Sequence, residues 1–229
     1  MLKIYSRDQI ATFLAILFHI VGLVGMLFFD KSLFAHSTYF HLLLMVGLLY
    51  YTHKGNNNSF VLFFIISFIV GVAVEWVGVN TGLLFGNYEY GNNLGPKIQN
   101  VPIIIGANWV MIIYCCGNAV SMFFNKIARK FEDQIAIKRN KLHAFSLIID
   151  GAFLAVIFDF ILEPAAIKLG YWQWLGDGDI PSLNYICWFL TSAALLAVFR
   201  WLKIYSNNLF AVHLLLIQVL FFLIINAFL

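Results

Sequence analysis

The chain has 229 residues, of which 62% are hydrophobic and only 11% are charged, with a formal net charge of +3. A soluble domain carries about 25% charged residues, so this composition excludes an ordinary soluble protein. It indicates a single integral membrane domain over residues 1–229, with no internal repeat and no low-complexity tract.

Apolar runs recur along the chain, each about long enough for a helix that crosses a bilayer, which takes about 20 residues. In chain order they are Ile10–Phe29, Phe34–Tyr51, Phe60–Val79, Val101–Phe124, Phe145–Ile167, Leu183–Trp201 and Leu209–Leu229. We therefore predict an all-α fold, a polytopic bundle of seven transmembrane helices, in which Phe34–Tyr51 is the weakest span. The first run is long and lacks a small-residue cleavage site, so we interpret it as a retained helix and not as a signal peptide.

The placement of lysine and arginine predicts the orientation, because cytoplasmic loops are enriched in both. With the N-terminus inside, eleven of the 14 Lys and Arg residues fall on inner segments, and only Lys31, Lys97 and Lys168 fall on outer ones. We predict a multi-pass protein of the cytoplasmic (inner) membrane, with the N-terminus inside and the C-terminus outside. The basic segment Lys126–Lys141 is then an inner loop beside anionic lipid. The lipid bilayer is the expected partner, and no nucleic acid is expected.

Four acidic residues lie inside the predicted spans, where charged groups are costly and point to function: Glu75, Asp150, Asp159 and Glu163. Asp150 falls on the opposite side of its helix from Asp159 and is interpreted as interfacial. Asp159 and Glu163 are one turn apart on one face. Two carboxyls so close in a low dielectric do not both ionise at neutral pH, so one should keep its proton. Pro164 follows directly and predicts a break or kink beside the pair. The alternative interpretation is a buried structural pair.

The predicted topology brings polar residues of four spans to one depth, near the outer leaflet. They are Glu75 in the third span, Asn108 and Trp109 in the fourth, Asp159 and Glu163 in the fifth, and Asn184 and Trp188 in the sixth. Each alone is explained by hydrogen bonds between helices, but the shared depth favours a site.

Two long outer loops, Asn80–Asn100 and Lys168–Ser182, flank that depth. Their aromatic residues include Tyr88, Tyr90, Trp172 and Trp174. These side chains either form an aromatic belt at the membrane interface or line a ligand cavity.

Several function classes are excluded by what the sequence lacks. No lysine lies in a span interior, which excludes a retinal Schiff base, and the six histidines show no close pairing of the kind that di-iron enzymes use. There is also no phosphate-binding glycine motif of the kind that holds nucleotide cofactors. From these absences together we predict no metal and no cofactor. The polar residues gather at one end without an inverted repeat, which disfavours a transporter. What remains is proton chemistry on an apolar substrate.

Two blocks of sequence resemble a known family. They are EWVGVNTGLLFGNYEYGNNLGPKIQNVPIIIGANWVM (Glu75–Met111) and DFILEPAAIKLGYWQWLGDGDIPSLNYICW (Asp159–Trp188). Together, and in this order, they resemble the carotenoid 1′,2′-hydratases of the CruF type over roughly half of the chain. Glu163 stands where that family usually has aspartate, and Cys187 stands where it has a small residue, often glycine. These changes bear on the substrate more than on the reaction.

The resemblance implies an enzyme that adds water to the terminal 1′,2′ double bond of an acyclic carotenoid end, giving a tertiary alcohol. The carotenoid is then the partner, of the γ-carotene, lycopene or bisanhydrobacterioruberin kind, and other enzymes of carotenoid biosynthesis are candidate partners. We assign catalysis to Asp159, Glu163 and Glu75. In one assignment Asp159 is the proton donor, and Glu163 with Glu75 stabilises the cation or takes the proton from water; in the alternative these roles are swapped. The predicted substrate-binding residues are Asn108, Trp109, Asn184, Trp188, Tyr88 and Trp172.

Two alternatives stay open on the sequence alone. A carotenoid cyclase begins with the same protonation, but an internal double bond captures the cation in place of water. A non-catalytic carotenoid-binding membrane protein would need no acid pair.

Overall fold

The computed structural model describes residues 5–128, 136–204 and 207–229. The helices are α1 (Arg7–Phe28), α2 (Lys31–His36), α3 (Thr38–Thr52), α4 (Asn57–Thr81), α5 (Ile105–Ala128), α6 (Ala136–Lys168), α7 (Ser182–Trp201) and α8 (Leu209–Phe228). The strands are β1 (Tyr88–Tyr90), β2 (Lys97–Ile98), β3 (Val101–Pro102) and β4 (Trp172–Trp174).

Within these residues, seven helical segments are long and apolar enough to cross a membrane, with α2 and α3 together making one of them. The predicted all-α bundle of seven spans is therefore confirmed. Large apolar side chains cover its outside: Phe40 is 72% exposed and Phe160 is 63% exposed. A soluble monomer rarely exposes so much contiguous apolar surface, whereas such a surface suits contact with lipid. The orientation of the termini stays a prediction.

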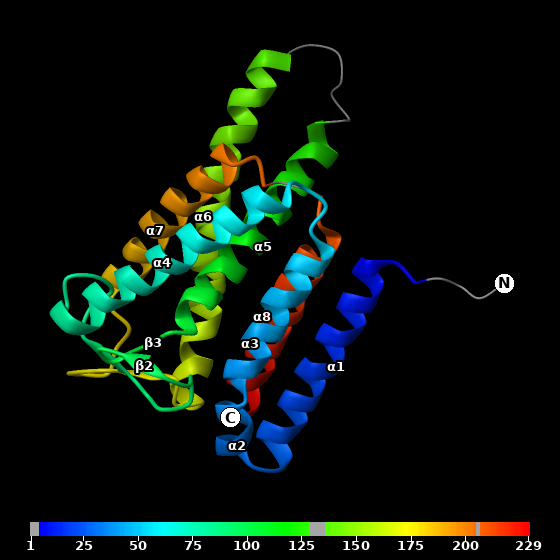
Figure 1. Cartoon of the computed structure of the whole chain (residues 1–229). Coiled ribbons are helices and arrows are strands. Elements are labelled where there is room, and N and C mark those ends of the chain that lie inside the picture. Colours follow the sequence, from blue (N-terminus) through cyan, green and yellow to red (C-terminus); the bar gives the residue numbers. More distant parts are fainter. Residues whose placement is uncertain (1–4, 129–135, 205–206) are drawn as a thin grey trace.

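Helix α5 forms the centre of the bundle, with α1, α3 and α8 on one side and α4 and α7 on the other (Figure 1). In the most apolar stretch of α5, 72% of the residues are buried inside the bundle, whereas the buried share in the other spans is 28–39%. Small residues allow this, because they let helix backbones approach closely. At Gly106 a Cβ atom would lie only 2.8 Å from the carbonyl oxygen of Phe68 in α4.

Two spans differ from the sequence prediction: the fourth begins later, and the second is divided into two helices. The fourth span was expected from Val101, but Val101 and Pro102 form β3, and the helix begins at Ile105. The second span is divided at Ser37, whose hydroxyl donates to the carbonyl of Phe34 at 2.7 Å. Serine bonds of this kind compete with the helical ladder, which explains the interruption between α2 and α3.

The expected break at Pro164 does not occur, and α6 continues to Lys168. A proline removes the hydrogen bond from its own nitrogen and crowds the carbonyl four residues before it, but the residues after it can continue the helix. The kink at Pro164 stays a prediction. The chain turns at Gly170, which has a left-handed φ of 67°. There the N–H of Tyr171 donates to the carbonyl of Ala166 at 2.9 Å, a common helix ending.

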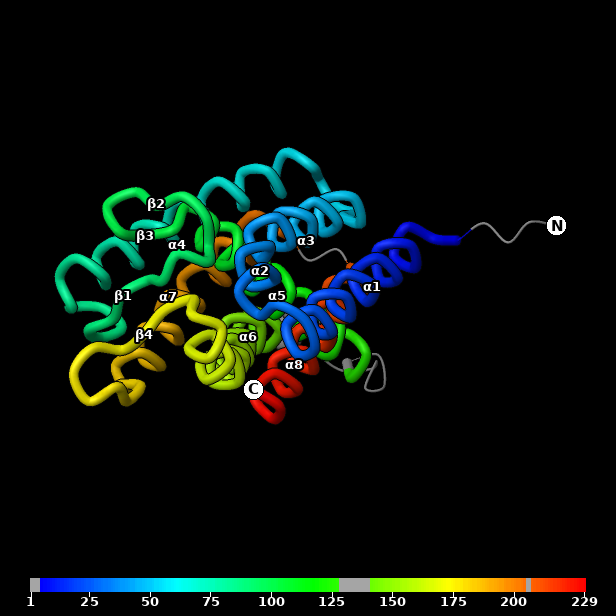
Figure 2. Tube along the Cα trace, turned by 90° about the horizontal axis from the view of Figure 1, so that it is seen from below, coloured from blue at the N-terminus to red at the C-terminus, as the bar shows by residue number. Residues whose placement is uncertain are grey.

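The two long loops are joined by a short antiparallel sheet that the sequence did not predict. Strand β1 pairs with β4, so that Tyr88 lies opposite Trp174 and Tyr90 lies opposite Trp172. Figure 2 shows these strands side by side at one end of the bundle, which we call the loop end. The basic segment Lys126–Lys141 lies partly outside the described residues, so its placement beside lipid stays a prediction.

Candidate active site

Three carboxyl groups are buried at the loop end: Glu75 of α4, and Asp159 and Glu163 of α6. The solvent-exposed fractions of these residues are 5%, 0% and 2%, respectively. In the part of the chain that the structure describes, the only ion pair joins Lys54 to Asp8, so no basic side chain neutralises the three acids there. Neutral N–H and O–H donors hold them.

Glu75 accepts hydrogen bonds from three such donors. The hydroxyls of Tyr88 and Tyr90 donate to its Oε2 at 2.5 and 2.7 Å, and the indole N–H of Trp109 donates to its Oε1 at 3.0 Å. Burial, with the nearby Glu75 charge, raises the pKa of both tyrosines, so both remain donors at neutral pH. Three donors and no acceptor suit an ionised carboxylate, which only accepts.

Glu163 is held in the same way from the other strand. The indole N–H groups of Trp172 and Trp174 both donate to its Oε2 at 3.0 Å. Residues two apart on a strand point to the same face, so β4 presents both indoles together, as β1 presents its two tyrosines. Each strand therefore supplies both of its aromatic donors to a carboxyl of a different helix.

Asp159 has fewer donors than its neighbours. The side-chain amide of Asn184 donates to Asp159 Oδ2 at 2.8 Å and to Glu163 Oε1 at 3.3 Å, and so links the two acids. Asp159 Oδ1 is buried and finds no hydrogen-bond partner among the described residues. A protonated carboxyl needs fewer donors than a carboxylate does. Of the two linked acids, Asp159 is thus the one better arranged to hold a proton.

A small pocket of about 20 Å³ opens between two of the acids, Glu75 and Glu163, and is also lined by Asn184 and the aromatic residues around them. This volume accommodates one water molecule, and the polar lining offers the two to four partners that a buried water needs. Trp188 lines the pocket and stacks on Trp109, with ring centroids 4.1 Å apart.

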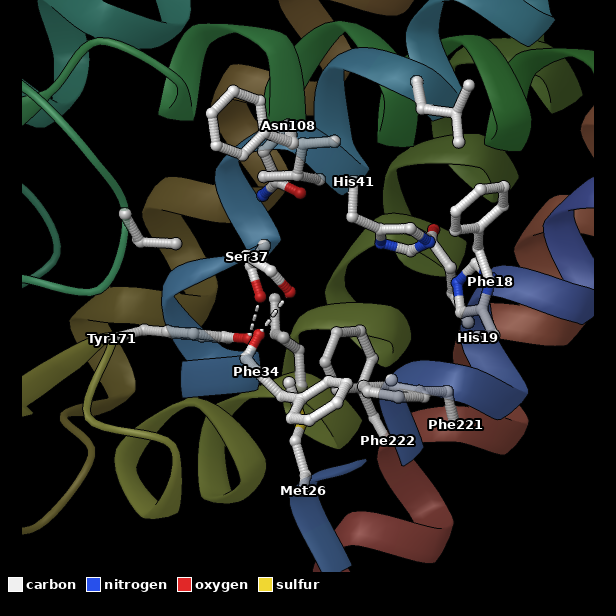
Figure 3. A pocket seen from close by; sticks show the side chains of 18 of the residues that line it. Phe18, His19, Met26, Phe34, Ser37, His41, Asn108, Tyr171, Phe221 and Phe222 are labelled. Carbon is white, nitrogen blue, oxygen red and sulfur yellow. Dashed lines mark hydrogen bonds between the residues drawn. The ribbon is translucent and has the colours of Figure 1, made fainter. Parts of the chain in front are cut away.

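A larger, mostly apolar cavity of about 330 Å³ lies beside this pocket, between α1, α3, α5 and α8. Figure 3 shows that Phe18, Phe34, Phe221 and Phe222 line it. Ile105 and Trp172 line both spaces, so the cavity adjoins the acid cluster through these two side chains.

The predicted site residues do not all lie in one place. A single cluster of hydrogen bonds and ring contacts, whose two halves meet where the Tyr90 ring contacts that of Trp172, joins most of them: Glu75, Asp159, Glu163, Tyr88, Trp109, Trp172, Asn184 and Trp188. Asn108 lies apart from that cluster and lines the larger cavity. Trp109 is fully buried and serves as a donor to Glu75. The catalytic and substrate-binding roles of all these residues stay predictions.

Sequence reasoning left Tyr90 and Trp174 off the list of site residues, although each donates directly to a carboxyl. The signal was the alternation in YEY and WQW, since two aromatics spaced by two residues predict one face of a strand. Among the described residues, no three His, Cys, Asp or Glu side chains are grouped as ligands of a metal would be.

A family model for carotenoid biosynthesis proteins matches residues 36–229 of the chain. The matched part includes the acid cluster and both loops, and it leaves out α1. No curated protein and no solved structure matches the chain.

Proposed function

Because the chain belongs to the family of carotenoid biosynthesis proteins, we propose that it hydrates the terminal double bond of an acyclic carotenoid end to a tertiary alcohol. One observation carries the choice of hydration: the pocket with room for one water lies between Glu75 and Glu163, beside an acid pair that no cation neutralises in the described chain.

The first step is protonation of the alkene. An isolated carbon–carbon double bond is a weak base, so the acid must be held protonated away from bulk water. Asp159 fits this requirement, because it is fully buried and one of its oxygens is unpartnered within the described chain. Its proton forms the new C–H bond at the less substituted carbon with the π electrons, which leaves a tertiary cation.

The second step is capture of that cation by water. A water in the small pocket forms the C–O bond and passes a proton to Glu163, which lines the pocket and is joined to Asp159 through Asn184. The acid pair begins and ends with one proton, so no cofactor is consumed. Trp188 also lines the pocket, and an aromatic face near a cation contributes roughly 0.5–2 kcal/mol.

The small pocket cannot hold the carotenoid end itself. The end group would lie in the larger cavity, against Ile105 and Trp172, which border both spaces. A cyclase would have to keep water away from the cation, so a water-sized space between two carboxyls favours hydration. A carrier would have no use for an acid pair buried without a cation.

The test is expression of the chain in cells that make acyclic or monocyclic carotenoids, followed by chromatography and mass spectrometry of the pigments. We expect product heavier by one water, and a loss of about 10²–10⁴-fold in Asp159→Asn and Glu163→Gln, the usual contribution of an acid–base group. Asp150→Asn is the matched control, because Asp150 is an exposed acid on the same helix.

Three outcomes would contradict the proposal. A product of unchanged mass with a shifted retention time would indicate a cyclase. Unaltered pigment from both substrate types would remove the support for an enzyme. Equal activity of Asp159→Asn and the Asp150→Asn control would show that the acid pair is structural.

A further inference from the structure

The larger cavity combines an apolar wall with polar groups whose hydrogen-bonding capacity is not used within the described chain. Gln218 of α8 is only 4% exposed. Its amide nitrogen contacts the sulfur of Met111 at 3.3 Å, and its Oε1 has no partner among the described residues. An amide buried in this way carries a desolvation cost that a ligand could relieve.

His41 of α3 has a second polar atom that lacks a hydrogen-bond partner in the described residues. Its Nε2 is buried, again with no partner in the described residues, and its ring meets that of His19 edge-on with centroids 4.4 Å apart. Figure 3 shows both imidazoles, together with Asn108, on the wall of the cavity.

The contacts between these residues place the polar groups near one another. The His19 ring lies 5.6 Å from that of Phe221, which is one helical turn beyond Gln218 on α8. The partner of Gln218, Met111, is likewise one turn beyond Asn108 on α5. Residues three apart on a helix are neighbours, so these contacts bring Gln218 towards the histidines on one side and towards Asn108 on the other. All four side chains line the same cavity.

The cavity volume of about 330 Å³ is far larger than the ~30 Å³ of one water, and lies at the lower end of the range for pockets that bind organic ligands. The unpartnered oxygen of Gln218 needs a hydrogen-bond donor, which a hydroxyl supplies and a ketone or a hydrocarbon does not.

We propose that the cavity binds the alcohol end of an isoprenoid chain, with its hydroxyl at Gln218 and His41 and its hydrocarbon along the phenylalanine wall. This is the cavity in which the proposed hydration places the carotenoid end, and a hydroxylated isoprenoid end is the class of product that such a reaction releases. The binding itself is inferred from the groups that line the cavity and would hold without the reaction.

The experiment compares two ligands with the same carbon skeleton, the tertiary alcohol nerolidol and the hydrocarbon farnesene. The full chain is purified into phosphatidylcholine nanodiscs, and the shift of its thermal unfolding with ligand content gives an apparent Kd for each. We expect the alcohol to bind about tenfold more tightly, since one satisfied buried group is worth about that factor. Gln218→Leu and His41→Leu should each lower the ratio of the farnesene Kd to the nerolidol Kd without weakening the binding of farnesene.

A matched pair of glycine variants tests the location. Gly22 lines the cavity, and an added Cβ would meet only Phe221, at 3.9 Å, so Gly22→Leu should fill the space and weaken both ligands at least about tenfold. Gly47→Leu, with nothing within 4 Å of its added Cβ, should bind as the wild type does.

Equal affinity of the wild type for the two ligands would overturn the proposal, as would an unchanged ratio in both polar variants or normal binding by Gly22→Leu. Asp159→Asn should keep the full preference for the alcohol. A failure of the proposed hydration is therefore distinguishable from a failure of this binding site.

Discussion

Replacing Asn184 with leucine removes the donor that joins the two acids of α6. The amide gives one hydrogen bond to Asp159 at 2.8 Å and a longer one to Glu163 at 3.3 Å. A bond to a charged group contributes about 1.5–3 kcal/mol and a neutral one about 0.5–1.5 kcal/mol. With Glu163 charged and Asp159 protonated, the sum predicts that Asn184→Leu lowers the free energy of unfolding by about 2–4.5 kcal/mol.

The assay is equilibrium unfolding of the purified chain in mixed micelles, followed by the loss of helical signal. Asn80→Leu serves as the control, because Asn80 is an exposed asparagine whose amide donates only to backbone carbonyls. Such surface changes usually alter stability by no more than about 0.5 kcal/mol.

A double-mutant cycle shows whether the loss comes from the acid pair. Asn184→Leu combined with Asp159→Asn should show a coupling energy of about 0.5–3 kcal/mol, as residues of one hydrogen-bond network do. Strictly additive effects, or a loss for Asn184→Leu no larger than that for Asn80→Leu, would refute the assignment of Asn184 as the link.

Gly71→Ala should lower the free energy of unfolding by about 1–3 kcal/mol through overpacking, because its Cβ would lie 2.7 Å from the Trp109 side chain. Thermal unfolding measures this loss, and the control Gly47→Ala should show none because nothing lies within 4 Å of its added Cβ. Gly91→Ala should lower the unfolding temperature, since its Cβ would lie 2.1 Å from a backbone carbonyl oxygen; an unchanged value would contradict the close approach of the two loops. Burial lowers the pKa of His53 from its ordinary 6.5. The folded protein therefore keeps this imidazole neutral, and the free energy of unfolding should fall as the pH drops below about 6.5, less steeply in His53→Gln.

Much of the fold follows from composition, because a run of about 20 apolar residues has few stable alternatives to a spanning helix. The strand pair does not follow in that way. Tyr88 and Trp174 are far apart in the sequence, and each strand has only three residues, so the pairing depends on how the helices place the loops. Pro164 could not by itself decide between a break and a kink for a related reason, since whether a helix continues past a proline depends on the packing around it.

The candidate site could also be predicted in part: its residues were recognisable, but not the direction in which each side chain points. The acids were recognisable because carboxyls are rare in apolar spans, and a shared depth pointed to Asn184 and Trp188. Whether a side chain faces the acids or a neighbouring cavity depends on helix rotation, which sequence spacing does not fix between helices. That is why Asn108 was grouped with the acids although it lines the larger cavity.

The β1–β4 pair has a consequence for how an apolar molecule reaches the acids. Lifting the strands would break four hydrogen bonds to carboxyls, from Tyr88, Tyr90, Trp172 and Trp174. At about 1.5 kcal/mol or more for each, the open form would be populated less than about once in 10⁴ molecules. We therefore expect the substrate to enter and leave sideways, between the lipid-facing helices. The turnover rate should then follow the mole fraction of substrate dissolved in the bilayer and be insensitive to its concentration in water.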